Sequence, residues 1–258
     1  EYLAEKKIDA FMSAGNTGAM LVGSIQILKP IEGVDRPCLT SAIPRPSLKS
    51  GVLLDVGANA DCKPEHLQQF AILGSVYAQA VQKIENPQVG LLNIGEEDMK
   101  GNDQVKAAAK LLENSSLNYI GYVEGNSINA GHVKVDLIVT DGFVGNVALK
   151  TSEGLAHLMG GFLSQEFKRN LFTKVMALIS MPVLNAWKKR LDPRRYNGAS
   201  FLGLRGIVVK SHGGADAFAF KHAIIKAIEE AKSGVLSHIT EQLAIEHAQS
   251  NAAPANSD

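Results

Sequence analysis

The sequence predicts an α/β protein in which helices cover both faces of a mostly parallel β-sheet, a three-layer α/β/α arrangement. Short apolar runs alternate along the chain with longer segments of helical periodicity. Most of these runs are apolar on both faces, as expected for parallel strands buried between helices. With 258 residues, 45% of them hydrophobic, the chain can bury the core of one large or two small domains.

The predicted strands and helices follow one another in a regular order. The strands are IDAFM (8–12), GVLLDV (51–56), QVGLLNI (88–94), NYIGYV (118–123), VDLIVT (135–140) and GIVVKS (206–211). A helix is predicted over residues 64–84, because Pro64 suits a first helical position and apolar residues recur there at helical spacing. Asp103 is expected to cap the helix that follows the third of these strands.

Composition and missing motifs exclude several function classes. Basic and acidic residues number 26 each, so we expect no nucleic-acid partner. Cys38 and Cys62 are too few for a disulfide scaffold and suit a reducing cytoplasm. The seven histidines show no metal-binding spacing, and the chain lacks the GxGxxG, GxxxxGK[ST] and GxSxG motifs. We therefore expect no metal, no cofactor and no serine-hydrolase triad.

Five turns at the ends of predicted strands are rich in Gly and Asn. They are SAGNTGAM (13–20), DVGANADCKPE (55–65), NIGEEDMKGNDQVK (93–106), TDGFVGNVALK (140–150) and KSHGGADAF (210–218). In an open α/β sheet, ligands bind at the carboxyl ends of strands, where helix N-termini direct N–H groups at anions. One such turn could be only a tight connection. Five together predict a composite site for phosphate or a carbonyl group.

In this order, the motifs SAGNTGA, LLDVGAN, NIGEE with KGND, TDGFVGNVALK and GIVVKSHGGAD resemble those of the bacterial phosphate acyltransferases of phospholipid synthesis. The resemblance covers residues 1 to about 240. It implies an enzyme that converts a long-chain acyl-acyl carrier protein and inorganic phosphate into an acyl phosphate. It also implies a fold like that of phosphotransacetylases and isopropylmalate dehydrogenases, a homodimer, and a cytoplasmic, peripherally membrane-associated location. A membrane-bound glycerol-phosphate acyltransferase would use the product.

The implied chemistry is attack of a phosphate oxygen on a thioester. Phosphate is already an anion and a thiol has a pKa of about 8.5, so the protein mainly positions the reactants and stabilises charge. We expect catalytic roles for Lys100, Asn102, Asn146 and His212, with the two asparagines as oxyanion donors. Phosphate or substrate contacts are expected from Asn16, Thr17, Gly18, Asp55, Asn59, Asp103, Gly145, Lys150 and Lys210.

Three of these assignments have structural alternatives. Lys150 could equally be a solvated helical lysine, and His212 could serve only to satisfy a strand end. Aspartates are common at turns and helix caps, so Asp55 could be structural.

Residues 165–200 are predicted to form a helical insertion that faces a membrane or a partner. Residues 168–195 hold eight basic residues and one acidic residue, a net charge of +7, around an apolar run that Pro182 interrupts. The uncharged run 175–187 is shorter than the roughly 20 residues that span a bilayer. An interfacial anchor would use Leu178, Ile179, Val183, Leu184 and Trp187. Contact with acidic acyl carrier protein or with a second subunit remains open.

We expect residues 1–245 to form a single α/β catalytic domain whose N-terminal part is missing, and residues 246–258 to be a disordered tail. One rival function is a phosphotransacetylase-like enzyme acting on a short acyl-coenzyme A. Another is a noncatalytic membrane scaffold that recruits acyl carrier protein. A nicotinamide-dependent dehydrogenase is disfavoured because no Gly-rich cofactor fingerprint is present.

Overall fold

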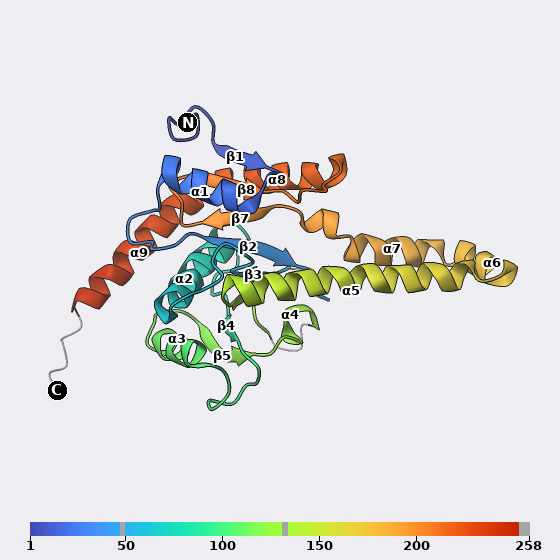
Figure 1. Cartoon of the computed structure of the whole chain (residues 1–258), viewed down its shortest axis with the longest axis horizontal. Helices are drawn as coiled ribbons and strands as arrows, with labels where there is room; N and C mark the ends of the chain where they lie inside the picture. Colours follow the sequence, from blue (N-terminus) through green and yellow to red (C-terminus); the bar gives the residue numbers. More distant parts are fainter. Residues whose placement is uncertain (47–49, 131–133, 253–258) are drawn as a thin grey trace.

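A computed structural model describes residues 1–46, 50–130 and 134–252 and confirms the predicted fold class (Figure 1). One eight-stranded sheet runs through the molecule in the order β1-β8-β7-β2-β3-β6-β4-β5. The strands are β1 (Ala10–Ser13), β2 (Cys38–Ile43), β3 (Gly51–Leu54), β4 (Val89–Leu92), β5 (Tyr119–Val123), β6 (Leu137–Val139), β7 (Ala199–Leu202) and β8 (Ile207–Lys210).

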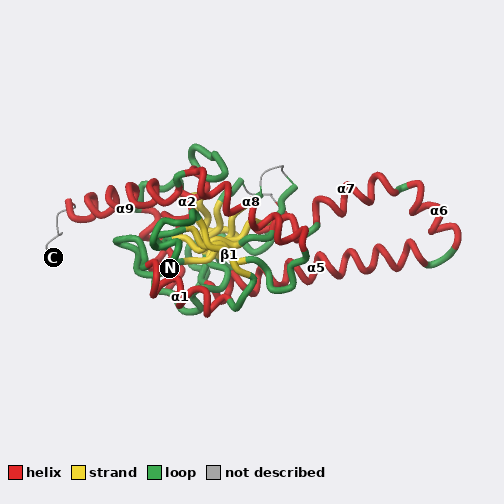
Figure 2. The backbone as a smooth tube through the Cα atoms, turned by 90° about the horizontal axis from the view of Figure 1, so that it is seen from above, coloured by secondary structure: helices red, strands yellow, loops and turns green. Residues whose placement is uncertain are grey.

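Helices cover both faces of the sheet, which Figure 2 shows from above. One face packs against α2 (Pro64–Ala80), α3 (Asp103–Glu113), α8 (Ala217–Ser233) and α9 (Val235–Ala252). The other packs against α1 (Thr17–Leu28), α4 (Ser127–Ala130) and the first turns of α5 (Gly142–Lys168). Neighbouring residues of one strand point to opposite faces of the sheet: Leu53 packs in the core that includes α1, and Leu54 in the core that includes α2, and both are fully buried.

The sheet contains two parallel groups of opposite direction. β1 pairs with β8 in parallel, as do β3 with β6, β6 with β4, and β4 with β5. Between the groups, β7 and β2 make three antiparallel pairings in succession. All six predicted strands are present, whereas β2 and β7 were not predicted. Their sequences, CLTSAI and ASFL, carry buried hydroxyl residues that break the apolar pattern.

A helical arm extends from the body of the molecule (Figures 1 and 2). We define it as residues 155–191, comprising the outer part of α5 with α6 (Leu171–Ile179) and α7 (Met181–Leu191). The segment predicted as a helical insertion, residues 165–200, begins as a continuation of α5 and is mostly α-helical up to Leu191, and β7 starts at Ala199. Helix α6 lies at the tip of the arm, between α5 and α7, and Pro182 lies in the first turn of α7, where no hydrogen bond is lost through its missing N–H. Among the described residues, no helix is long and apolar enough to cross a membrane.

Two local expectations are corrected. The N-cap of α3 is Asn102, whose Oδ1 accepts a hydrogen bond from the Val105 N–H at 2.9 Å, and Asp103 is the first helical residue. Residues 246–252 belong to α9 and are not a disordered tail, since that stretch contains no helix breaker before Pro254. Residues 253–258 lie outside the described residues.

The first turn of α5 packs directly on the turn that follows β3. The Gly142 N–H donates to the Asn59 carbonyl at 2.7 Å. A Cβ on Gly145 would lie 1.9 Å from the Asp55 carbonyl oxygen, a distance that no side chain tolerates. Gly145 therefore permits a close helix-to-turn contact.

We expect Gly145→Ala to destabilise the protein by about 1–3 kcal/mol or more, because the backbone of two packed elements must move apart. Gly160→Ala in the same helix is the control: its added Cβ meets no atom within 4 Å, so it should stabilise by up to about 1 kcal/mol through helix propensity. Urea unfolding followed by circular dichroism measures both. Equal effects of the two substitutions would contradict the packing argument.

Candidate functional site

The turn after β3, residues 55–63 (the Asp55 turn), is organised by a buried carboxylate. Asp55 is fully buried and accepts hydrogen bonds from five N–H groups. The donors are the backbone N–H groups of Leu39 (3.0 Å), Gly57 (3.2 Å), Ala58 (3.0 Å) and Asn59 (2.6 Å), and Nδ2 of Asn59 (2.9 Å). Burial raises the pKa of Asp55, while the bonds from Ala58, Leu39 and Asn59 oppose that rise.

This arrangement corrects one expectation. The N–H groups predicted to bind phosphate at the Asn59 turn already bind the chain's own carboxylate. Nδ2 of Asn59 also donates to the Pro37 carbonyl, at 2.8 Å. Asp55 and Asn59 thus shape the turn, in line with the structural role that aspartate commonly has in turns.

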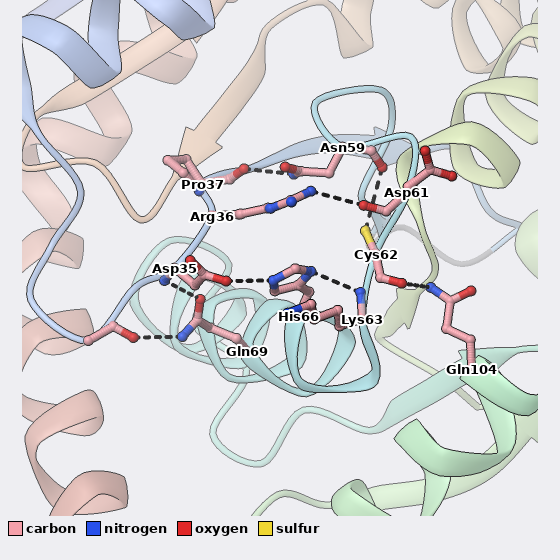
Figure 3. A network of polar contacts seen from close by, with 11 residues as sticks. Asp35, Arg36, Pro37, Asn59, Asp61, Cys62, Lys63, His66, Gln69 and Gln104 are labelled. Atoms are coloured by element: carbon pink, nitrogen blue, oxygen red, sulfur yellow. Dashed lines mark hydrogen bonds and ion pairs between the residues drawn. The ribbon is translucent and has the colours of Figure 1, made fainter.

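The segment before β2 holds the other end of the Asp55 turn in place (Figure 3). Nη1 of Arg36 donates to the Asp61 carbonyl at 2.9 Å. Nδ1 of the buried His66 accepts the Lys63 N–H at 2.9 Å, so its Nε2 carries the proton and donates to Asp35 Oδ2 at 2.6 Å. His66 was not among the predicted site residues, although its position three residues after Lys63, at the start of α2, is that of a capping-box residue.

The loop after β4, residues 93–102 (the Lys100 loop), carries two predicted catalytic residues. Asn93 closes it: Nδ2 donates to the Lys100 carbonyl at 3.2 Å, and Oδ1 accepts the Ile94 N–H at 2.9 Å. Gly101 has φ +92°, and a Cβ there would lie 2.4 Å from Asn93 Oδ1, so the loop needs glycine at this point. Lys100 is exposed, whereas Asn102 uses its side-chain oxygen to cap α3.

One face of α5 carries Asn146 and Lys150, which lie one helical turn apart and therefore point the same way. Asn146 is exposed and lies beside the Asp55 turn: a Cβ placed on Gly57 would lie 3.5 Å from the Cγ of Asn146. Lys150 pairs with Glu153 at 2.7 Å. Partial burial and the nearby charge of Lys150 lower the pKa of Lys210, the last residue of β8.

The turns after β1 and β8 lie side by side, and the Ser211 N–H donates to the Ser13 carbonyl at 2.9 Å. Asn16 caps α1 by accepting the Ala19 N–H at 3.0 Å, which leaves the N–H groups of Thr17 and Gly18 directed out of the helix end. Nδ1 of the exposed His212 accepts the Gly214 N–H at 3.0 Å, so Nε2 is its donor atom.

The predicted residues therefore form two groups. Asp55, Asn59, Lys100, Asn102, Asp103, Gly145 and Asn146 lie at the carboxyl ends of β3, β4 and β6, whereas Asn16, Thr17, Gly18, Lys210 and His212 lie at those of β1 and β8. The two sets of strands run in opposite directions, but their carboxyl ends lie at about the same level of the sheet, because Thr40 pairs with both Leu54 and Ser200, and Ser200 pairs with Val209 next to the end of β8. Helix α5 connects the groups, with Asn146 in the first and Lys150 close to the second.

Two comparisons of the sequence agree. The family model described as "Fatty acid synthesis protein" matches residues 1–238. A phosphate acyltransferase from Alkalilimnicola ehrlichii is 54% identical over 245 residues, covering 94% of this chain and 70% of that protein. One from Methylococcus capsulatus is 53% identical over 235 residues, covering 91% of this chain and 68% of that protein.

Solved structures show the same fold at low identity. A phosphotransacetylase from Streptococcus pyogenes aligns with a TM-score of 0.59 and 18% identity, over 89% of this chain and 65% of that one. The EutD phosphotransacetylase from Staphylococcus aureus gives 0.56 and 16%, over 90% and 65%. The expected likeness to the phosphotransacetylase fold is thus confirmed. The sequence identity over nearly the whole chain shows that this protein belongs to the phosphate acyltransferase family of enzymes.

Proposed function

We propose that this chain makes an acyl phosphate from a long-chain acyl-acyl carrier protein and inorganic phosphate, for phospholipid synthesis. The observation that carries the proposal is the α5 face, where the exposed amide of Asn146 lies one turn from Lys150, and Lys150 lies near Lys210. A hydrogen-bond donor beside two cations suits a reaction that joins an anion to a carbonyl carbon.

In the proposed reaction, a phosphate oxygen attacks the thioester carbonyl carbon. Lys150, Lys210 and the N-terminus of α1 at Thr17 and Gly18 attract the phosphate. The carbonyl oxygen becomes an oxyanion, which Nδ2 of Asn146 stabilises by a hydrogen bond. The C–S bond then breaks, the thiolate leaves and takes a proton from water, and the acyl phosphate remains. Lys100 adds positive charge, and Nε2 of His212 offers a further donor to the phosphate.

The same groups would serve a phosphotransacetylase-like reaction on a short acyl-coenzyme A, and a scaffold that only recruits acyl carrier protein would need none of them. A preference for long acyl chains would distinguish the proposed enzyme from the phosphotransacetylase-like alternative. Phosphate-dependent cleavage of the thioester would distinguish it from the scaffold.

We expect thiol release from long-chain acyl-acyl carrier protein to require phosphate, and Asn146→Ala to lower kcat about 10²–10³-fold through loss of an oxyanion donor. Because related enzymes are longer, the assay is run on this chain and on the chain extended to their length. Asn185→Ala, also an exposed helical asparagine, is the control and should leave kcat unchanged. Near-normal turnover of Asn146→Ala would exclude the oxyanion role.

Phosphate binding should weaken above a certain pH, which we call its alkaline limit, and we expect Lys150→Met to raise this pH. Partial burial and, to a smaller extent, the charge of Lys150 lower the pKa of Lys210, so Lys210 loses its proton, and with it the attraction for phosphate, at a lower pH than an ordinary lysine. Removing the charge of Lys150 raises that pKa again, although binding at neutral pH weakens. The measurement is KM for phosphate against pH, with the exposed Lys110→Met as control. An alkaline limit that stays in place would contradict the coupling.

We also propose that the arm holds the enzyme on an anionic membrane surface, where the acyl phosphate passes to a membrane-bound glycerol-phosphate acyltransferase. Leu178, Ile179 and Val183, near the junction of α6 and α7, are 68–71% exposed. Leu184 and Trp187 are half-buried in the same hairpin, with Lys188, Lys189 and Arg190 following. Apolar groups beside basic residues are what an interfacial segment requires. A homodimer would cover other apolar residues of the arm, such as Leu158 and Phe162.

We expect Leu178→Glu with Ile179→Glu to abolish binding to phosphatidylglycerol-containing vesicles without loss of the fold, because both side chains are exposed. Val22→Glu with Ile27→Glu on α1 is the matched control, since these residues are 57% and 49% exposed. Vesicle sedimentation measures binding. If the α1 variant loses binding and the arm variant does not, the arm is not the membrane contact.

A further inference from the structure

Gln104 joins the Lys100 loop to the Asp55 turn. It is the second residue of α3, two residues after the cap at Asn102, and its half-buried side chain donates from Nε2 to the Cys62 carbonyl at 2.7 Å (Figure 3). Among the side-chain hydrogen bonds of the described residues, no other links the Lys100 loop or the start of α3 to the Asp55 turn.

The hydrogen bonds that close each segment lie within that segment. The Lys100 loop is closed within itself by Asn93, and the Asp55 turn is closed around its own carboxylate. The Asp55 turn also contacts α5, through the Gly142 N–H bond to Asn59 and the packing of Asn146 beside Gly57. Helix α3 packs on α2, and β4 pairs with β6 in the sheet. Beyond this packing, the bond between Gln104 and Cys62 is the side-chain hydrogen bond among the described residues that ties the Lys100 loop to the turn beside Asn146.

We propose that Gln104 is a positioning residue for the acyl transfer, which sets the distance of the Lys100 loop from Asn146 by donating to the Cys62 carbonyl. Gln104 acts through Lys100 and does not itself touch substrate. This inference rests on the proposed function of the site. Displacement of a reacting or binding group by about 1 Å can cost up to about 10²-fold in rate.

The substitution Gln104→Glu separates positioning from simple stability. Glutamate has the shape of glutamine but cannot donate to the Cys62 carbonyl. An acidic residue in the first turn of a helix is favourable, so a purely structural view of α3 expects a neutral or stabilising change. Gln68→Glu is the matched control, because Nε2 of Gln68 also donates to a backbone carbonyl, that of Leu111 at the far end of α3 (3.4 Å).

Two readouts test the proposal. In hydrogen–deuterium exchange, Gln104→Glu should speed exchange of the peptide that covers residues 94–101, whereas Gln68→Glu should not. In the thiol-release assay, Gln104→Glu should lower kcat/KM for phosphate roughly tenfold or more, and the double variant with Lys100→Met should be no worse than Lys100→Met alone. Effects that multiply in the double variant, or unchanged exchange of residues 94–101, would overturn the proposal.

The exchange experiment needs no catalysis. If no phosphate-dependent thiol release is found, the proposed function fails while the link between Gln104 and the Lys100 loop is still decided by exchange. If release is found and exchange is unaffected by Gln104→Glu, the function stands and the positioning role fails.

Discussion

The arrangement of the candidate site depends on one buried carboxylate. Asp55 lies directly after β3 and binds N–H groups of β2 and of its own turn. A charged group without solvent is costly unless hydrogen bonds replace the lost water, and here five donors do so. The turn that results offers its carbonyl groups outward: the Asn59 carbonyl accepts from α5 and the Cys62 carbonyl from Gln104. An internal anion thus orders the backbone that receives both neighbouring elements.

The register of β2 and β7 brings the ends of two oppositely directed groups of strands to one level of the sheet. In a fully parallel sheet, all five Gly- and Asn-rich turns would follow strand ends that point the same way. Here β2 and β7 separate two parallel groups of opposite direction, and their pairing places Leu54, at the end of β3, in one row with Val209, next to the end of β8. Helix α5 starts beside the Asp55 turn, packs Ala148 and Leu149 into the core on the α1 side of the sheet, and brings Lys150 near Lys210. Its first turn can approach this closely because Gly142 and Gly145 have no side chains.

The apolar runs in the sequence were sufficient to predict six strands, since buried parallel strands are marked by hydrophobicity alone. They were insufficient for β2 and β7, where Thr40 and Ser200 are buried in the sheet and Ser200 is satisfied by Glu230, far away in the chain. In the site, the motifs indicated which turns matter but not which atoms are available. Asp55 binds the N–H groups of its own turn, and Asn102, not Asp103, caps α3. Both facts depend on the backbone geometry, and the sequence alone does not distinguish between neighbouring polar residues that could each fill such a role.

The continuity of α5 joins the candidate site to the arm through a single rigid element. The helix has 27 residues, so it is about 40 Å long. Asn146 lies in its second turn, and the apolar residues Leu155, Leu158 and Phe162, all more than half exposed, follow along its outer part. On the proposed orientation with the arm tip at a membrane, the length of α5 sets the height of the site above the lipid. The phosphate then remains in water while the acyl chain is delivered toward the surface, and any change in helix length or direction between Asn146 and the tip would alter that spacing.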